Sequence, residues 1–314
     1  MPVRWPDTVD QVLAGDLTAA LASVTPASGV VVIPVTGLGL RDREAGTLTV
    51  TTSLGLWKKL ERIDRNPHVA LAFHTREHGF SDRPEYVLAQ GKASFSPRPD
   101  REWLESIHPS WKRFLGPRDV GPLWDRWLRV YTWERVGVEI EVDRLLVWAD
   151  FACSEPGEVL GVPLPAAPPS PQRPPARGTG PRIKQARAAR RAERLPNVLL
   201  GWVAEDGFPI VVPVEVKGAE EGGILLEAPP GVVPVGGRRA GLTAHSFSAQ
   251  VKGQEQRIHT GWMEAAPDGR RVVYAPHTEA GYRLPSSTLL YRLAAGFVTR
   301  RGMRGARRAG FMTG

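Results

Sequence analysis

Short strand-like runs recur in the same order in the two halves of this 314-residue chain. The four matched runs are residues 33–35 with 212–214, 46–48 with 223–225, 71–74 with 242–245, and 90–92 with 260–262. The offset shrinks steadily from 179 to 170, and the order of the runs does not change. Four collinear matches between short alternating segments predict that the chain contains a duplicated β-rich unit.

The matched runs belong to short, Val-rich segments bounded by Gly, Pro, Asp or Asn, which is typical of strands. The expected strands are 30–35, 47–52, 68–74, 86–95 and 135–148 in the first half, and 210–216, 223–228, 240–245 and 256–264 in the second. Helices do not alternate with these segments, which argues against a doubly wound parallel sheet and favours small antiparallel barrels. Residues 99–131 add a helical insertion to the first half. We therefore predict a mainly β fold with added helices (α+β), made of two tandem barrels.

A Pro-rich stretch over residues 155–181 separates the two halves. Proline lacks the amide donor and fixes its own backbone angle, so this stretch is expected to be a linker. The following segment, 183–195, is rich in Ala and Arg but has large apolar residues only at its two ends, which predicts a solvated helix. The expected organisation is a first barrel over 1–152, a basic linker with its helix over 153–195, and a degenerate second barrel with an Arg-rich tail over 196–314.

The formal charge of +8 is concentrated in two short segments. Residues 173–194 hold eight basic residues against one acidic residue, and the last sixteen residues hold five arginines and no acid, so the rest of the chain is net acidic. These segments could bind nucleic acid electrostatically. They lack interleaved aromatic residues for base stacking, however, and arginine is common throughout this composition. Nucleic-acid binding through the basic linker is therefore the less favoured interpretation.

A few sequence features bear on the cellular compartment of the protein. Cys153 is the only cysteine, which excludes an intramolecular disulfide and any Cys-rich zinc site and suits a reducing compartment. The first ten residues do not lead into an apolar signal segment, and no later apolar run approaches the roughly 20 residues of a membrane-spanning helix. We expect a cytoplasmic protein that does not partner with a membrane.

Residues 53–65 form the segment with the clearest chemical signal. Its spacing predicts a helix with an apolar stripe (Leu56, Leu60, Ile63) and a basic stripe (Lys58, Arg62, Arg65), with Lys59 beside the latter. Ser53 is a suitable N-cap, and Thr51 and Thr52 end the preceding strand. A strand–hydroxyl–helix corner of this kind offers free amides, a positive helix end and lysines to a phosphate group. The alternative is a surface helix with a solvated basic face.

The sequence TTSLGLWKKLERIDRNPHVALAFH, followed by YVLAQGKASF, resembles the pyridoxamine 5'-phosphate oxidase-like split β-barrel proteins, which bind FMN or the deazaflavin F420. The resemblance is best over residues 30–95, weaker over 135–150 and weakest over 197–265. Two departures stand out. Leu56 and Trp57 occupy positions where flavin-binding members commonly have Ser and Arg, and the strand over 30–35 lacks the Arg that many members use as a second phosphate clamp.

The resemblance implies a set of cofactor-binding residues. Lys58 or Lys59 would contact the cofactor phosphate, Thr51, Thr52 and Ser53 would line the ribityl and phosphate end, and Lys92 would face the cofactor or substrate. The family places the cofactor between two barrels of a homodimer. A single chain would then form an intramolecular pseudo-dimer with one intact site. A monomer of this chain would therefore be enough to form the site. His245, Trp262 and Tyr282 are candidate wall residues of that site.

The resemblance also implies a function: an FMN-dependent oxidoreductase, or alternatively an F420-dependent one, that transfers hydride to or from a small organic substrate. The cofactor carries this chemistry itself, so no catalytic residue is assigned. A second hypothesis is a non-catalytic split barrel that binds a flavin or haem. No metal site is expected, because His74, Glu77 and His78 follow a strand and do not have the spacing of a helical zinc motif.

Overall fold

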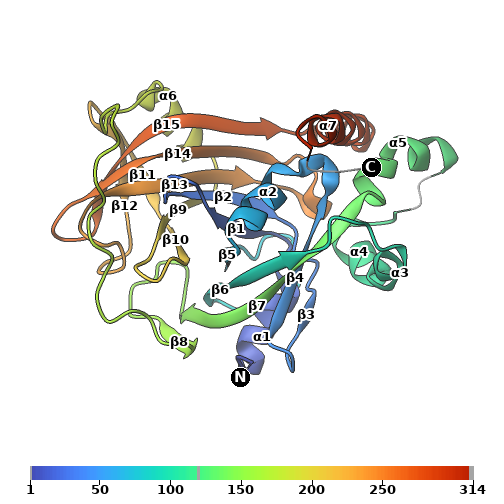
Figure 1. Ribbon diagram of the computed structural model, residues 1–314, viewed down its shortest axis with the longest axis horizontal. Coiled ribbons are helices and arrows are strands. Elements are labelled where there is room, and N and C mark those ends of the chain that lie inside the picture. The colour runs from blue at the N-terminus through green and yellow to red at the C-terminus, as the bar shows by residue number, and fades with distance from the viewer. Residues whose placement is uncertain (1, 119–120, 311–314) are drawn as a thin grey trace.

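The two halves of the chain fold into antiparallel sheets with the same strand order (Figure 1). The computed structural model describes residues 2–118 and 121–310. The first sheet has the order β2-β1-β5-β6-β7-β4-β3, with β8 also paired to β7, and the second has the order β10-β9-β13-β14-β15-β12-β11. Adding eight to each strand number of the first order gives the second. The duplication predicted from the matched runs is therefore confirmed, and so is the mainly β fold with added helices.

The bounds of the strands agree with most of the expected segments. The first sheet contains β1 (Ala19–Val24), β2 (Val30–Val35), β3 (Arg41–Asp42), β4 (Thr47–Ser53), β5 (His68–Phe73), β6 (Tyr86–Phe95), β7 (Arg135–Trp148) and β8 (Glu158–Gly161). The second contains β9 (Asn197–Val203), β10 (Pro209–Pro213), β11 (Glu215–Glu220), β12 (Gly223–Glu227), β13 (Gly236–Ser246), β14 (Glu255–Ala265) and β15 (Arg271–Arg283).

Each sheet bends at an equivalent glycine. The pairing of β6 with β7 shifts register between Gln90 and Gly91, and the pairing of β14 with β15 shifts between Thr260 and Gly261. A Cβ on either glycine would lie 2.1 Å from a carbonyl oxygen of the neighbouring strand. Only glycine allows the two strands to approach this closely at the bulge, and the matched pair of bulges fixes the alignment of the two units.

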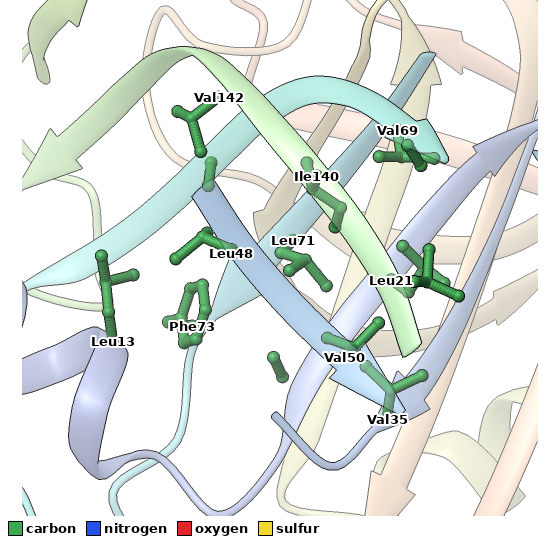
Figure 2. Close-up of a cluster of buried hydrophobic side chains, with 14 of the residues drawn as sticks. Leu13, Leu21, Val35, Leu48, Val50, Val69, Leu71, Phe73, Ile140 and Val142 are labelled. Atoms are coloured by element: carbon green, nitrogen blue, oxygen red, sulfur yellow. The ribbon is translucent and has the colours of Figure 1, made fainter. Parts of the chain in front are cut away.

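The core of the first half lies between its sheet and the N-terminal helix α1 (Asp7–Gly15). Figure 2 shows Leu13 of this helix meeting side chains of the sheet such as Leu21, Leu48, Leu71 and Ile140. Leu21, Leu48, Leu71 and Ile140 are each no more than 2% exposed. A separate core fills the second sheet around Leu200, a fully buried residue.

A third core joins the two sheets to each other. It combines strand residues of the first half, such as Ala72 and Leu88, with Leu199 and Val211 of the second. Polar groups cross the same interface: the Tyr86 hydroxyl donates to the Val211 carbonyl at 2.5 Å. Because this joint is apolar and buried, the two units form one continuous body.

The helix of the basic linker differs from the prediction. Helix α6 (Gln185–Glu193) does not stand free in solvent, because Ala188, Ala189 and Ala192 are buried against the second sheet. The prediction considered only large apolar residues, whereas an alanine stripe can pack closely on a sheet. Helix α6 precedes β9 as α1 precedes β1, so it lies with the second unit.

The helical insertion is confirmed as α3 (Arg101–Ser106), α4 (His108–Leu115) and α5 (Pro122–Thr132). The Arg-rich tail is also different from the expectation. Its arginines continue a 21-residue helix, α7 (Thr288–Arg308), which packs on the first half beside α5 (Figure 1). The last four residues of the predicted tail lie outside the described part of the chain. None of the described helices combines the length and apolar character needed to cross a membrane.

Candidate functional site

A cavity of about 610 Å³ lies between the two sheets. One wall is the corner where β4 ends, together with the 3-10 turn η1 (Leu54–Leu56) and helix α2 (Lys58–Arg65). The opposite wall comes from β14 and β15 of the second sheet, and helix α7 covers the space between them. The cavity is therefore assembled from both copies of the duplicated unit, and its size is within the usual range for small-molecule sites.

The corner after β4 has the capped geometry expected from the sequence, with one difference. The Ser53 hydroxyl accepts the amide of Gly55 at 3.1 Å and donates to the Val130 carbonyl at 2.7 Å. The predicted helix over 53–65 is divided, because residues 54–56 form a 3-10 turn and α2 begins only at Lys58. Since the hydroxyl of Ser53 is already used twice, its main contribution is to hold the corner in shape.

Five cationic side chains line the cavity, and none of its described lining residues is acidic. The five are Lys58, Lys59, Arg62, Arg135 and Arg301. They come from α2, the start of β7 and helix α7, so segments distant in sequence converge on one space. No described carboxylate lies within ion-pair distance of Lys58, Lys59, Arg62, Arg135 or Arg301. Uncompensated cations in a cleft favour an anionic ligand.

Lys59 and Arg135 form the less exposed part of this cationic group. Burial, together with the smaller effect of the positive charges of Arg135 and Arg62, lowers the pKa of Lys59 to about 8. The Arg135 guanidinium donates to the Thr51 hydroxyl at 2.6 Å and lies 4.8 Å from the ring centre of Trp111. Burial lowers the pKa of Arg135 from its usual value as well. An anionic group in the cavity would relieve the repulsion among these cations.

Tyrosine and glutamine side chains line another part of the cavity. The Tyr131 and Tyr291 hydroxyls are 3.1 Å apart, and the Tyr282 hydroxyl donates to Gln254 Oε1 at 2.9 Å. Burial raises the pKa values of Tyr282 and Tyr291, so both stay protonated at neutral pH. Gln256 is 5% exposed, yet its Oε1 has no hydrogen-bond partner among the described residues. A buried acceptor without a donor is costly, and a ligand could supply that donor.

Helix α7 reaches the cavity through an unusually close contact with η1. A Cβ at Gly302 would lie 1.7 Å from the Gly55 carbonyl oxygen, and a Cβ at Gly55 would lie 2.3 Å from the Thr299 carbonyl oxygen. Only glycine fits at both positions. The pair of glycines brings Arg301 to the same cavity as Lys59.

Because the two units are matched, a second position between the sheets is equivalent to this cavity. That position is filled by side chains. Counting back five residues from the matched glycines Gly91 and Gly261 gives Tyr86 and Gln256. Tyr86 is paired across the sheet with Trp148, whereas Gln256 is paired with Tyr282. Tyr86 and Trp148 are packed into the joint between the sheets, with 0% and 4% exposure. Within the described part of the chain, one of the two equivalent positions between the sheets is thus an open cavity, and the other is closed by Tyr86 and Trp148.

The structure brings most of the predicted site residues together. Thr51, Thr52, Ser53, Lys58 and Lys59 all line the cavity, as does the candidate wall residue Tyr282. Their roles in cofactor binding stay predictions.

Three other predicted residues do not reach this cavity. Lys92 is exposed on β6, and Trp262 is buried on β14 with its indole N–H donating to Glu264 at 3.1 Å. His245 is fully buried against its matched counterpart, with its Nε2 2.7 Å from His74 Nε2. His74 Nδ1 lies 3.0 Å from the Ala72 carbonyl and so carries a proton. The His245 Nε2–H then donates to His74 Nε2, and this pair joins the sheets instead of lining the site.

Sequence reasoning did not identify the contributions of Arg135, Gln256 and Arg301. Arg301 belongs to a segment that was interpreted as a tail. A usable signal was present, since Ala295, Thr299, Gly302 and Ala306 recur at helical spacing and form a face of small residues. No such local signal marks Arg135 or Gln256, because their position in the cavity depends on how the two sheets pack.

Within the described residues, the chain folds into two matched antiparallel sheets with a cationic cavity between them. No protein-family model matches the sequence, and a search of curated proteins found no match. Several solved structures are similar to parts of it. General stress protein 26 from Bacillus anthracis has 18% identity and a TM-score of 0.34, covering 50% of this chain and 97% of that one.

Two further structures show similarity of the same kind. A protein related to general stress protein 26, of the pyridoxinephosphate oxidase family from Clostridium acetobutylicum, has 9% identity and a TM-score of 0.33, covering 50% of this chain and 90% of that one. An F420 reductase has 19% identity and a TM-score of 0.32, covering 43% of this chain and 94% of that one.

Proposed function

We propose that this protein binds a phosphate-bearing flavin-type cofactor, FMN or alternatively F420, in the cavity between its sheets, and transfers hydride between it and a small organic substrate. The observation that carries this proposal is the convergence of five cations and no described acid on the corner after β4. The sequence pattern of that corner, which resembles the oxidase-like split barrels, supports it independently.

The residues present fit such a cofactor. The capped corner at Ser53 and the side chains of Lys58, Lys59, Arg62 and Arg301 suit a phosphate. The unpartnered Oε1 of Gln256 suits a ring N–H donor on the ligand. One phosphate carries a charge of about −1.5 to −2. The remaining positive charge therefore suits a second anionic group on the cofactor or the substrate.

When bound, a flavin or deazaflavin supplies the hydride chemistry. The chain contributes anchoring, orientation and exclusion of water. Lys59 and Arg301 would hold the anionic end. The Tyr282 hydroxyl gives its proton to Gln254 and can accept a hydrogen bond from the ligand, whereas the hydrogen-bonded pair Tyr131–Tyr291 uses only one of its two hydroxyl protons and can donate the other. Helix α7 covers the cavity, and this limits the access of water to a reacting group.

Titration with FMN and with F420, followed by tryptophan fluorescence, tests the binding proposal. The doubly substituted variant K58A/K59A should lose at least tenfold in affinity, because a hydrogen bond to a charged group contributes about 1.5–3 kcal/mol. Lys92→Ala removes one exposed lysine outside the cavity and serves as the matched control. Undiminished binding by the double variant would place the phosphate elsewhere, and no binding of either cofactor would exclude the proposal.

Turnover separates the oxidoreductase from a non-catalytic binding protein. Reduction of the bound cofactor by NADPH or another donor, followed by repeated reoxidation by an acceptor, would support the enzyme. Stable binding without turnover would support a storage or sensing role. A haem ligand would have to be held by a tyrosine, because the described lining residues include Tyr131, Tyr282 and Tyr291 but no His, Cys or Met.

A further inference from the structure

The outward face of helix α7 carries an exposed apolar stripe. Leu289, Leu293 and Phe297 follow one another at intervals of four residues, and their exposures are 56%, 43% and 59%. Leu290 beside them is 51% exposed. Exposing large apolar side chains to water is unfavourable in free energy. A contiguous group of them on one helix face therefore indicates a surface that binds a partner.

The same line of the helix continues into arginines. Arg300, Arg304 and Arg308 follow Phe297 at helical spacing, and they line a shallow hollow of about 500 Å³ together with Trp127 of helix α5. The described part of α7 contains no acidic residue. No described carboxylate lies within ion-pair distance of the Arg304 or Arg308 guanidinium groups. The face therefore joins an apolar half to an unneutralised cationic half.

The opposite face of α7 packs against the rest of the protein. Ala295, Thr299, Met303 and Ala306 are between 0% and 6% exposed. Gly302 fixes the rotation of the helix, because its contact with Gly55 leaves no room for a side chain. The exposed stripe cannot turn inward without breaking this packing, and the described part of the chain does not cover it.

We propose that this face of α7 docks the protein on the surface of an anionic lipid bilayer. Leucine and phenylalanine side chains enter the boundary between headgroups and acyl chains, and arginines pair with lipid phosphates, which is how basic amphipathic helices lie on membranes. A nucleic acid would leave the apolar stripe unexplained. A second copy of the chain, packed on this face of α7 about a twofold axis, would cover the apolar half but would bring no acidic residue of α7 to the arginine half.

The full-length protein is mixed with sedimentable vesicles of phosphatidylcholine alone or with 30% phosphatidylglycerol. We expect binding to the anionic vesicles that weakens with added salt, and at least tenfold weaker binding to the neutral ones. The variants L293S/F297S and R304E/R308E should each reduce the partition coefficient at least tenfold. Matched controls change the same residue types elsewhere: V162S/L164S alters exposed apolar residues of the linker, and R173E/R177E reverses two of its charges.

The alternative partners, a second copy of the chain or a nucleic acid, would each give a different experimental result. Equal binding by the α7 variants and the linker controls would overturn the proposal, and so would equal binding to neutral and anionic vesicles. A dimer in light scattering that L293S/F297S dissociates, without vesicle binding, would assign the face to a second copy. Binding of duplex DNA without vesicle binding would assign it to nucleic acid. The wild-type comparison of the two vesicle types keeps the test valid even if one variant is poorly folded.

Discussion

Replacing Lys59 by methionine tests the candidate site, because this residue combines burial with a cationic environment. Its pKa of about 8 lies well below that of a free lysine, chiefly because of burial. A bound phosphate would favour the charged form and raise this pKa again. FMN binding should therefore take up a proton above pH 8, and affinity should fall as the pH rises.

The magnitude follows from the fraction of Lys59 that is protonated in the free protein. With a pKa of about 8, roughly nine-tenths is protonated at pH 7 and roughly one-tenth at pH 9. The dissociation constant for FMN should thus increase about tenfold between these values, which corresponds to about 1.4 kcal/mol. Riboflavin, which lacks the phosphate, should show a smaller pH effect.

Isothermal titration calorimetry at pH 7 and pH 9, in buffers of different ionisation enthalpy, measures both the affinity and the proton uptake. Lys59→Met should weaken FMN binding at least tenfold at pH 7 and remove the loss above pH 8. Lys59→Arg keeps its charge throughout this range and should bind equally well at both values. Lys92→Met is the control outside the cavity. A wild-type affinity that is constant from pH 7 to 9, or a decline that Lys59→Arg retains, would refute the reasoning.

Three further perturbations address packing, titration and the closed counterpart of the site. Gly302→Ala should lower the unfolding free energy by about 1–3 kcal/mol, since its Cβ has no space, whereas Gly305→Ala, whose nearest contact is at 3.6 Å, should not lower it in urea denaturation. Burial lowers the pKa of His74 to about 4, so the native state resists its protonation. Stability should fall by about 3 kcal/mol as the pH drops from 6.5 to 4, a slope that should become shallower in His74→Gln. Introducing the closed pair as Gln256→Tyr with Tyr282→Trp should abolish FMN binding in fluorescence titration while circular dichroism stays native.

The repeated strands could be predicted from sequence because their alternation and turn residues are local. Strands β1, β9 and β15 are not among the expected segments. The segment of β1, Ala-Ala-Leu-Ala-Ser-Val, has the composition of a helix as much as that of a strand. The resemblance to the split-barrel family indicates the two lysines after β4: Lys58 when counted forward from Thr52, and Lys59 when counted back from Asn66 and Pro67. Of the second wall only Tyr282 could be predicted, from the resemblance, whereas Gln256 reaches the cavity only through the packing of one sheet on the other.

The fusion of both units in one chain makes the site independent of dilution. Two separate subunits would lose a shared cavity when they dissociate at low concentration, whereas a covalent link keeps the effective concentration of each half permanently high. Fusion also releases the halves from symmetry. In a twofold homodimer every substitution appears on both sides, but here Tyr86 and Trp148 can close one position while Gln256 and Tyr282 leave the other open. One of the two equivalent positions can therefore pack the joint between the sheets while the other stays open as the cavity.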